Sequence, residues 1–173
     1  MAVLPVRRYG DPVLRQKAKR VDTVTPELRA VIADMVDTMY DEVGIGLAAP
    51  QVGVSLRIVV MDDGKGGART LINPTITRRG GSVTGEEGCL SVPGIFADVE
   101  RSEWVFIEAQ DPEGGAISVE LRAWPARIIQ HEMDHLDGIL FIDRLPPVTR
   151  DRIKKRIQKE GFPTDTSRKA FAL

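Results

Sequence analysis

Hydrophobic positions recur at helical spacing in the first quarter of the chain. After Thr25 and Pro26, apolar residues return every three or four positions as far as Met39, and Gly44 follows. Threonine is a frequent N-cap, proline suits the first helical position, and glycine often follows a helix end. We therefore predict a helix from Thr25 to about Gly44 that packs on the core through Leu28, Val31, Ile32, Met35, Val36 and Met39.

The hydrophobic period shortens between Leu56 and Ala123. The runs LRIVVM, TLINPTI, WVFIEAQ and ISVELRA are rich in β-branched or aromatic residues, and the turn sequences DDGKGG, RRGG and DPEGG lie among them. Such runs between turn sequences are typical of antiparallel strands.

Further helices are predicted on both sides of the strands. A short one is opened by Asp11 as N-cap and Pro12, one begins at Pro125 and ends near Gly138, and one covers about 149–160. Because the helices precede and follow the strands instead of alternating with them, we expect an α+β fold.

Composition adds limits on what the protein can be. The chain has 173 residues and a formal charge of -1, so one domain, residues 1–173, is expected, with no general attraction to nucleic acid or an anionic membrane. Cys89 is the single cysteine, and no apolar run is long enough for a signal peptide or a membrane span. A cytoplasmic protein is expected, although an organellar form without its transit peptide would look the same.

Both histidines of the chain lie in the segment QHEMDHLDG, four residues apart. Positions i and i+4 share a helix face, so His131 and His135 can direct their imidazoles at one point, with Glu132 about 100° round the helix. H-E-x-x-H on a helix is a metallohydrolase signature, in which two ligands stand beside an acid that takes a proton from water. Met133, on the opposite side, can anchor the helix in the core. The alternative is a pair of surface histidines, or buried ones satisfied by hydrogen bonds.

Two histidines leave a metal site incomplete, and Cys89 is the candidate for the third ligand. It lies in GEEGCLSVPG, whose glycines suit an irregular loop or a strand end close to the helix. Two imidazoles and one thiolate leave the fourth position of a tetrahedral site open, as catalysis requires. This ligand set suits Zn(II) or Fe(II) better than Mg(II) or Ca(II). A lone cysteine is otherwise usually a small buried hydrophobic residue.

The segment GIGLAAPQVG, residues 44–53, follows the long predicted helix. It lacks the lysine and the spacing of a phosphate-binding loop. Its small residues allow the backbone to approach a ligand closely, and Gln51 can offer an amide N–H to a developing oxyanion. Taken alone, such a segment is more often a tight connection after a helix.

The segments GIGLAAPQ, EGCLS and QHEMDH, in this order and with these separations, resemble the three motifs of the peptide deformylases. The resemblance extends from DPVLR to the C-terminal helix. It implies antiparallel β-sheets packed around a central metal-binding helix, with N-terminal helices and a C-terminal helix. It also implies a bacterial enzyme that removes the N-formyl group from the initiator methionine of nascent chains and releases formate.

By motif position, the resemblance implies that Cys89, His131 and His135 bind one divalent metal ion. Fe(II) is the native metal that it implies, and members of the family often tolerate Zn(II), Ni(II) or Co(II). Glu132 would be the general base and would later donate a proton to the leaving amine.

The same resemblance implies how the substrate is held. Gln51 and the backbone N–H of Leu90 would stabilise the oxyanion. The backbone of Gly44–Gly46 would pair with the extended peptide, which is recognition by strand addition.

The methionine side chain requires an apolar pocket, and the resemblance places Ile45, Leu90 and Ile128 in its walls. His131 would lie at its base, and Trp124 is a further candidate. For each aliphatic residue, ordinary core packing is the alternative. The segment WPAR departs from many bacterial members, which have smaller apolar residues at the tryptophan and arginine positions, so the pocket shape is open.

Two further expectations concern charged residues. A buried acid needs a partner, and Glu87 is expected to pair with Arg101, which lies at the matching family position. The predicted last helix carries Arg150, Arg152, Lys154, Lys155, Arg156 and Lys159. Such a face is usually only solvated, but in a family that acts at the ribosome it can bind ribosomal RNA weakly through phosphate contacts.

Two other kinds of protein share part of this pattern. A zinc endopeptidase also has H-E-x-x-H, but its third ligand is typically His or Glu, so Cys89 counts against it. A noncatalytic metal-binding module would need a fourth protein ligand, and the chain has no further Cys or His to supply one.

Overall fold

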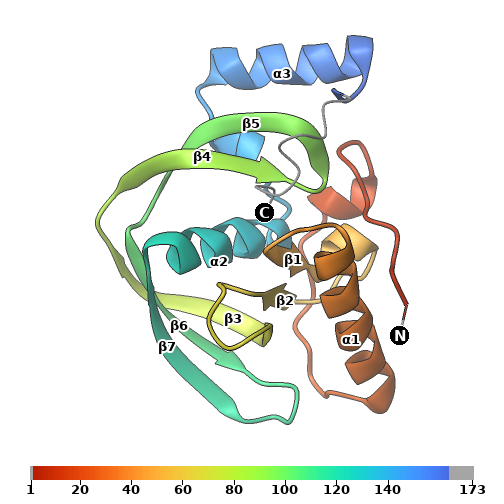
Figure 1. Cartoon of the computed structure of the whole chain (residues 1–173), viewed down its shortest axis with the longest axis vertical. Helices are drawn as coiled ribbons and strands as arrows, with labels where there is room; N and C mark the ends of the chain where they lie inside the picture. The colour runs from red at the N-terminus through yellow and green to blue at the C-terminus, as the bar shows by residue number, and fades with distance from the viewer. Residues whose placement is uncertain (1, 164–173) are drawn as a thin grey trace.

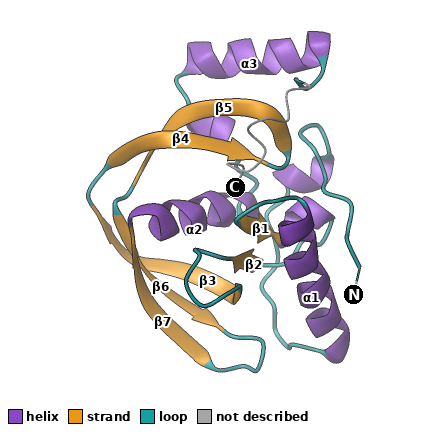
Figure 2. Ribbon diagram, viewed as in Figure 1, coloured by secondary structure: helices purple, strands orange, loops and turns teal. Residues whose placement is uncertain are grey.

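The computed structural model describes residues 2–163, and one long helix, α2, runs through the middle of the fold (Figure 1). A five-stranded sheet lies on one side of α2 and a pair of strands on the other, as the colouring by secondary structure shows (Figure 2). The helices are α1 (Pro26–Asp41), α2 (Ala123–Leu136) and α3 (Pro147–Glu160), and the 3₁₀ helices are η1 (Pro12–Arg15), η2 (Ala49–Val52) and η3 (Phe141–Arg144). The strands are β1 (Gly46–Ala48), β2 (Ile58–Met61), β3 (Arg69–Gly80), β4 (Val83–Cys89), β5 (Val92–Arg101), β6 (Trp104–Gln110) and β7 (Ala116–Arg122).

Every strand pair in the described elements is antiparallel. The larger sheet has the order β1-β2-β3-β6-β7, and β4 pairs with β5 in the second sheet. Strand β1 is therefore an edge strand, hydrogen-bonded to β2 on one side only. The helices lie before and after the strands, which confirms the predicted α+β fold.

Strand β2 is apolar throughout because it is buried on both faces. Ile58 and Val60 face one hydrophobic cluster together with Met35 and Met39 of α1. Val59 and Met61 point the other way, into the cluster formed with Ile128, Ile129 and Leu136 of α2. The sheet thus lies between α1 and α2, and α2 packs on one of its faces.

A third hydrophobic cluster joins β4 and β5 to η3 and α3, and it includes Cys89 together with residues of η3 and Ile157 of α3. Helix α3 stands on the outer side of β5, away from α2 (Figure 1). Ile157 is its one buried residue, so most of the α3 surface faces solvent.

The long N-terminal helix is as predicted. The Thr25 hydroxyl accepts a hydrogen bond from the Leu28 N–H, and the predicted apolar stripe packs on the sheet. The segment opened by Asp11 and Pro12 is a single 3₁₀ turn, in which the Asp11 carboxylate accepts from the Val13 N–H.

Other boundaries differ from the prediction. Helix α2 begins at Ala123, so the predicted start at Pro125 was wrong by two residues. The N–H groups of a first helical turn have no partner within the helix, so a proline, which lacks an N–H, fits in that turn even though it is not the first residue. Strands β1, β4 and β5 were not predicted, although Cys89 does lie at a strand end, as expected. The tail from residue 164 onward lies outside the part of the chain that is described, and none of the described helices is long and apolar enough to cross a membrane.

Candidate metal centre and active site

The ligands predicted from the sequence meet at one point. Cys89 comes from the end of β4, and His131 and His135 come from successive turns of α2. One ligand atom from each of the three lies within 4.8 Å of the others, and all three side chains are buried. The Cys89 Sγ is 3.4 Å from His135 Nε2, and the two imidazole rings lie with their centroids 5.2 Å apart.

Unpartnered polar atoms test whether a metal fits this site. His131 Nε2, His135 Nδ1 and both carboxylate oxygens of Glu132 are buried without a hydrogen-bond partner within the described protein. Buried polar atoms normally have partners, and an ion held by the ligand residues would supply one to His131 Nε2. A thiolate and two imidazoles are a fitting donor set for a divalent transition metal with one open position.

Burial and neighbouring charge shift the pKa values of these groups. Burial alone lowers the pKa of His131, but the Cys89 sulfur and the Glu87 carboxylate outweigh it and raise the pKa to about 10. Burial raises the pKa of Glu132 to about 7, although the charge of His131 opposes the shift. Burial and the charge of His131 hold the pKa of His135 well below its ordinary value. Without a bound ion, His131 is therefore the charged imidazole of the pair and His135 the neutral one.

Strand β1 lies directly against the acid of the motif. A Cβ on Gly46 would be 2.8 Å from Glu132 Oε1 and 3.0 Å from Ile128 Cγ2. A Cβ on Gly44 would be 2.8 Å from Leu90 Cδ1. The backbone of the 44–46 segment therefore packs closely against Leu90, Glu132 and Ile128.

Gln51 also lies at the site, within the 3₁₀ turn η2 that follows β1. Its Oε1 accepts from the Ala48 N–H at 2.9 Å, which fixes the amide so that Nε2 faces the metal centre. Nε2 is 3.7 Å from Cys89 Sγ and donates to Ser91 Oγ at 3.1 Å. The structure thus brings Gln51, Leu90 and Cys89 together, and Ser91 is a site residue that sequence reasoning missed.

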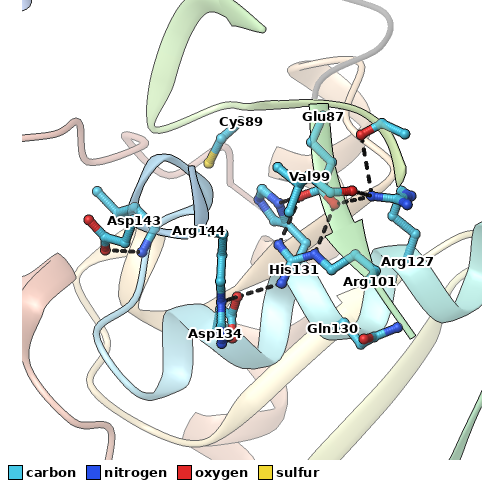
Figure 3. A network of polar contacts seen from close by, with 12 residues as sticks. Glu87, Cys89, Val99, Arg101, Arg127, Gln130, His131, Asp134, Asp143 and Arg144 are labelled. Carbon is cyan, nitrogen blue, oxygen red and sulfur yellow. Dashed lines mark hydrogen bonds and ion pairs between the residues drawn. The ribbon is translucent and has the colours of Figure 1, made fainter. Parts of the chain in front are cut away.

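A buried ionic network lies beside the ligand residues and contacts His131 through Glu87 (Figure 3). Arg101 contacts both oxygens of Glu87, at 2.9 and 2.8 Å, which confirms the predicted pair. Glu87 Oε1 lies 2.9 Å from His131 Nδ1. Desolvation opposes ionisation of Glu87, but hydrogen bonds from Arg101 and His131 outweigh it and hold its pKa well below the ordinary range. The Glu87 carboxylate is therefore ionised at every physiological pH.

Three members of this network were not predicted as such. Arg101 also donates to Asp134, which in turn binds Arg144 at 2.7 Å. Asp134 is three residues after His131 on α2, and at this spacing the two side chains lie on neighbouring parts of one helix face. This spacing is the feature of the sequence from which the role of Asp134 could have been predicted. Arg127 points into the network and contacts Glu87 at 2.6 Å. Arg127, the arginine of WPAR, therefore belongs to this network and does not form part of an apolar pocket wall.

The predicted pocket residues have different degrees of burial. Ile128 and Leu90 are buried, and Ile45 is partly buried and packs against the cluster that contains Ile128. Trp124 is 42% exposed and lies one helical turn before Ile128. Met133 is partly buried and packs against the same cluster, as expected for an anchor of α2.

Comparison with known proteins agrees with this geometry. The family model described as polypeptide deformylase matches residues 3–151. A peptide deformylase from Alkalilimnicola ehrlichii is 49% identical over 162 residues, which cover 92% of this chain and 91% of that protein. A second, from Pseudothermotoga lettingae, is 48% identical, with 90% of each chain covered.

Solved structures of peptide deformylases also resemble this fold. The peptide deformylase from Legionella pneumophila has a TM-score of 0.86 and 41% identity, over 91% of this chain and 95% of that one. The peptide deformylase from Synechococcus elongatus in complex with actinonin has a TM-score of 0.84 and 44% identity, over 93% and 87% of the two chains. With its three motifs gathered at one buried centre, the chain belongs to the polypeptide deformylase family.

Proposed function

We propose that the protein removes the formyl group from the N-terminal methionine of nascent polypeptides by hydrolysis, with Glu132 as the residue that moves the proton. The observation that carries this proposal is the buried carboxylate of Glu132, which has no hydrogen-bond partner among the described residues and follows His131, one of the three converging ligand residues. Membership of the deformylase family supports the same reaction.

Cys89, His131 and His135 would hold one divalent metal ion, and Fe(II) is proposed as the native metal. When bound, such an ion lowers the pKa of a water molecule toward neutrality and polarises the formyl oxygen. Glu132 takes the proton from the attacking water and returns it to the amine that leaves. A carboxyl group can serve in both steps, because it is a base when ionised and an acid once it has taken the proton.

The direct test is formate release from an N-formylmethionyl tripeptide by anaerobically purified protein, with its metal content measured in the same preparation. Formate is expected, together with about one Fe(II) for each chain. A metal-loaded protein that releases no formate but cleaves internal peptide bonds would be an endopeptidase instead.

Gln51 and the backbone N–H of Leu90 are proposed to receive the negative charge that forms on the formyl oxygen. The fixed orientation of the Gln51 amide supports this role, since its Nε2 lies beside Cys89. A donor held in place before the reaction costs no reorganisation when the charge develops.

Replacing Gln51 by alanine is expected to lower kcat by about 10²- to 10³-fold, the usual cost of one oxyanion donor. Ser91→Ala is the matched control, because it removes the other partner of Nε2 and leaves the amide in the site. Steady-state kinetics with the formylated tripeptide would measure both variants. A kcat for Gln51→Ala close to that of Ser91→Ala would contradict the oxyanion role.

The methionine side chain is proposed to bind among Ile45, Leu90 and Ile128, with His131 at the base and Trp124 at the outer end. The peptide that follows is proposed to pair with Gly44–Gly46. Strand β1 is an edge strand whose second side has no strand partner in the described part of the chain, which supports strand addition.

Weak ribosome association through α3 is also proposed, and it accords with a cytoplasmic enzyme that acts on nascent chains. Arg152, Lys155 and Lys159 are exposed, and their spacing of three and four residues places them on one helix face, away from the buried Ile157. Three exposed basic residues on one face can contact RNA phosphates.

Reversing these three charges to glutamate is expected to abolish co-sedimentation with ribosomes at low salt and to leave kcat for the tripeptide unchanged. The matched control reverses Lys17, Arg29 and Lys65, which are exposed elsewhere and change the net charge equally. Equal co-sedimentation of the two triple variants would refute a specific role for α3.

A further inference from the structure

Arg127 joins three elements around the metal centre. It lies in the second turn of α2, four residues before His131, and its side chain is 7% exposed. The guanidinium donates to the carbonyl oxygens of Val83 at 2.7 Å and Val99 at 2.8 Å. It also donates to Glu87 Oε2 at 2.6 Å. One side chain of α2 therefore ties both β4 and β5 to the helix that carries two of the ligands (Figure 3).

These contacts complete the hydrogen bonding of Glu87. Oε2 accepts from Arg101 Nε at 2.9 Å and from Arg127. Oε1 accepts from Arg101 Nη2 at 2.8 Å and meets His131 Nδ1 at 2.9 Å. An ionised carboxylate only accepts hydrogen bonds, so the hydrogen of this last contact belongs to His131 Nδ1.

The hydrogen on Nδ1 decides what the other ring nitrogen can do. With its Nδ1 hydrogen held by Glu87, the ring can release its other hydrogen and offer the Nε2 lone pair to an ion, and His131 Nε2 is one of the buried atoms that have no partner within the described protein. The carboxylate behind the ring thus selects the tautomer and ring orientation in which Nε2 can bind a metal.

We infer that Arg127 is a positioning residue for the metal centre. It acts through Glu87: it holds Oε2 and the ends of the two strands, so that Oε1 stays aimed at His131 Nδ1. Arg101 is held only through side chains, since it contacts Glu87 and Asp134, and so it could follow Glu87 into another rotamer. Arg127 cannot, since its other hydrogen bonds fix it to the backbone of β4 and β5.

Gly85 of β4 is the complement of this arrangement. A Cβ at this position would lie 3.2 Å from Cζ, Nε and Nη2 of Arg127, closer than side chains usually come. The absence of a side chain at residue 85 leaves the space that the guanidinium occupies. This accounts for a glycine within a strand, where glycine is otherwise unfavourable.

Metal affinity tests the inference without any substrate. Co(II) is the probe, and its dissociation constant is measured by competition with a chelator while the visible spectrum reports the thiolate and imidazole ligands. Arg127→Met keeps a long side chain but removes the guanidinium and its hydrogen bonds. It is expected to weaken Co(II) binding by about 10- to 100-fold, the usual effect of losing the groups that orient a metal-bound histidine. Arg122→Met is the matched control, since it removes an exposed arginine paired with Glu120 near the start of the same helix.

Arg127→Lys keeps the charge near Glu87 but cannot reach both strand carbonyls, so an affinity between those of wild type and Arg127→Met is expected. It also serves if Arg127→Met does not fold. A second readout is the Nδ1 proton of His131, which should give a slowly exchanging, downfield NMR signal in the zinc-loaded wild type and a faster exchanging one in the arginine variants.

The inference rests on the proposed metal site but not on the proposed reaction, and the outcomes separate the two. Wild type that does not bind Co(II) would refute the metal site. Wild type that binds Co(II), with a folded Arg127→Lys or Arg127→Met variant that keeps the same affinity and the same Nδ1 signal, would overturn the role of Arg127.

Discussion

Replacing Glu132 by glutamine is expected to lower kcat for formate release by about 10²- to 10⁴-fold, the range that general acid–base groups contribute. Glutamine has almost the same shape as glutamate, so it should fit in the space beside Gly46. It cannot take a proton from water or return one to the leaving amine, because its amide does not titrate in this range. KM should change little, since neither proton transfer occurs when the substrate binds.

Metal content has to be equal in the two proteins for this result to mean loss of the base. Glu132 is not one of the three ligand residues, so Glu132→Gln is expected to bind Co(II) as tightly as wild type to within a few fold. Formate release within 10-fold of wild type, at equal metal content, would show that another group moves the proton.

Replacing Arg101 by alanine is expected to destabilise the protein by about 3 kcal/mol or more, because it removes a buried cation that pairs with two buried acids at once. Glu87 is fully buried and Asp134 largely so, and Arg101 contacts both. For a chain of this length, about 3 kcal/mol corresponds to a fall in Tm of roughly 6 to 12 °C. Thermal unfolding at pH 7, followed by circular dichroism, would measure it.

The pH dependence of this effect has a definite sign. The pKa of Glu87 is lowered in the folded protein, so its ionised form stabilises the fold at pH values above the ordinary carboxyl pKa of 4.5. That stabilisation is lost as the pH falls from there toward the folded-state pKa. The difference in Tm between wild type and Arg101→Ala should therefore narrow in acid.

Arg122→Ala is the control for the Arg101 experiment. Arg122 and Glu120 form an exposed pair, and exposed pairs contribute about 1 kcal/mol or less. Equal Tm values for Arg101→Ala and Arg122→Ala would contradict a stabilising role of the buried network.

The elements that sequence reasoning found are those whose pattern is local. The apolar stripe of α1 and the strands β6 and β7 can be predicted from the period of their hydrophobic residues. The pairing of His131 with His135 can be predicted from helical spacing alone. Strands β4 and β5 do not, because GEEGCLSVPG combines glycine, acids and proline, all of which are depleted in strands. They are held as strands by mutual pairing and by Arg127, which is a long-range contact.

The candidate site shows the same division. The metal ligands could be proposed because H-E-x-x-H and a single cysteine leave few combinations open. The contacts of Arg127 and Ser91 could not, because they depend on how β4 and the turn after β1 approach α2 in three dimensions. Local spacing predicts what one element presents, whereas packing decides which elements meet.

The position of Cys89 in the chain gives the metal centre a second consequence. Cys89 and His135 are 46 residues apart in sequence, and strands β5, β6 and β7 lie between them. An ion held by both would close a covalent loop through these strands, much as a disulfide does in a secreted protein. In the chain-entropy account, a disulfide around a loop of that size stabilises the fold by about 4 kcal/mol. A chain whose single cysteine cannot form an intrachain disulfide would thereby gain a cross-link that persists in a reducing compartment and is released only when the ion leaves.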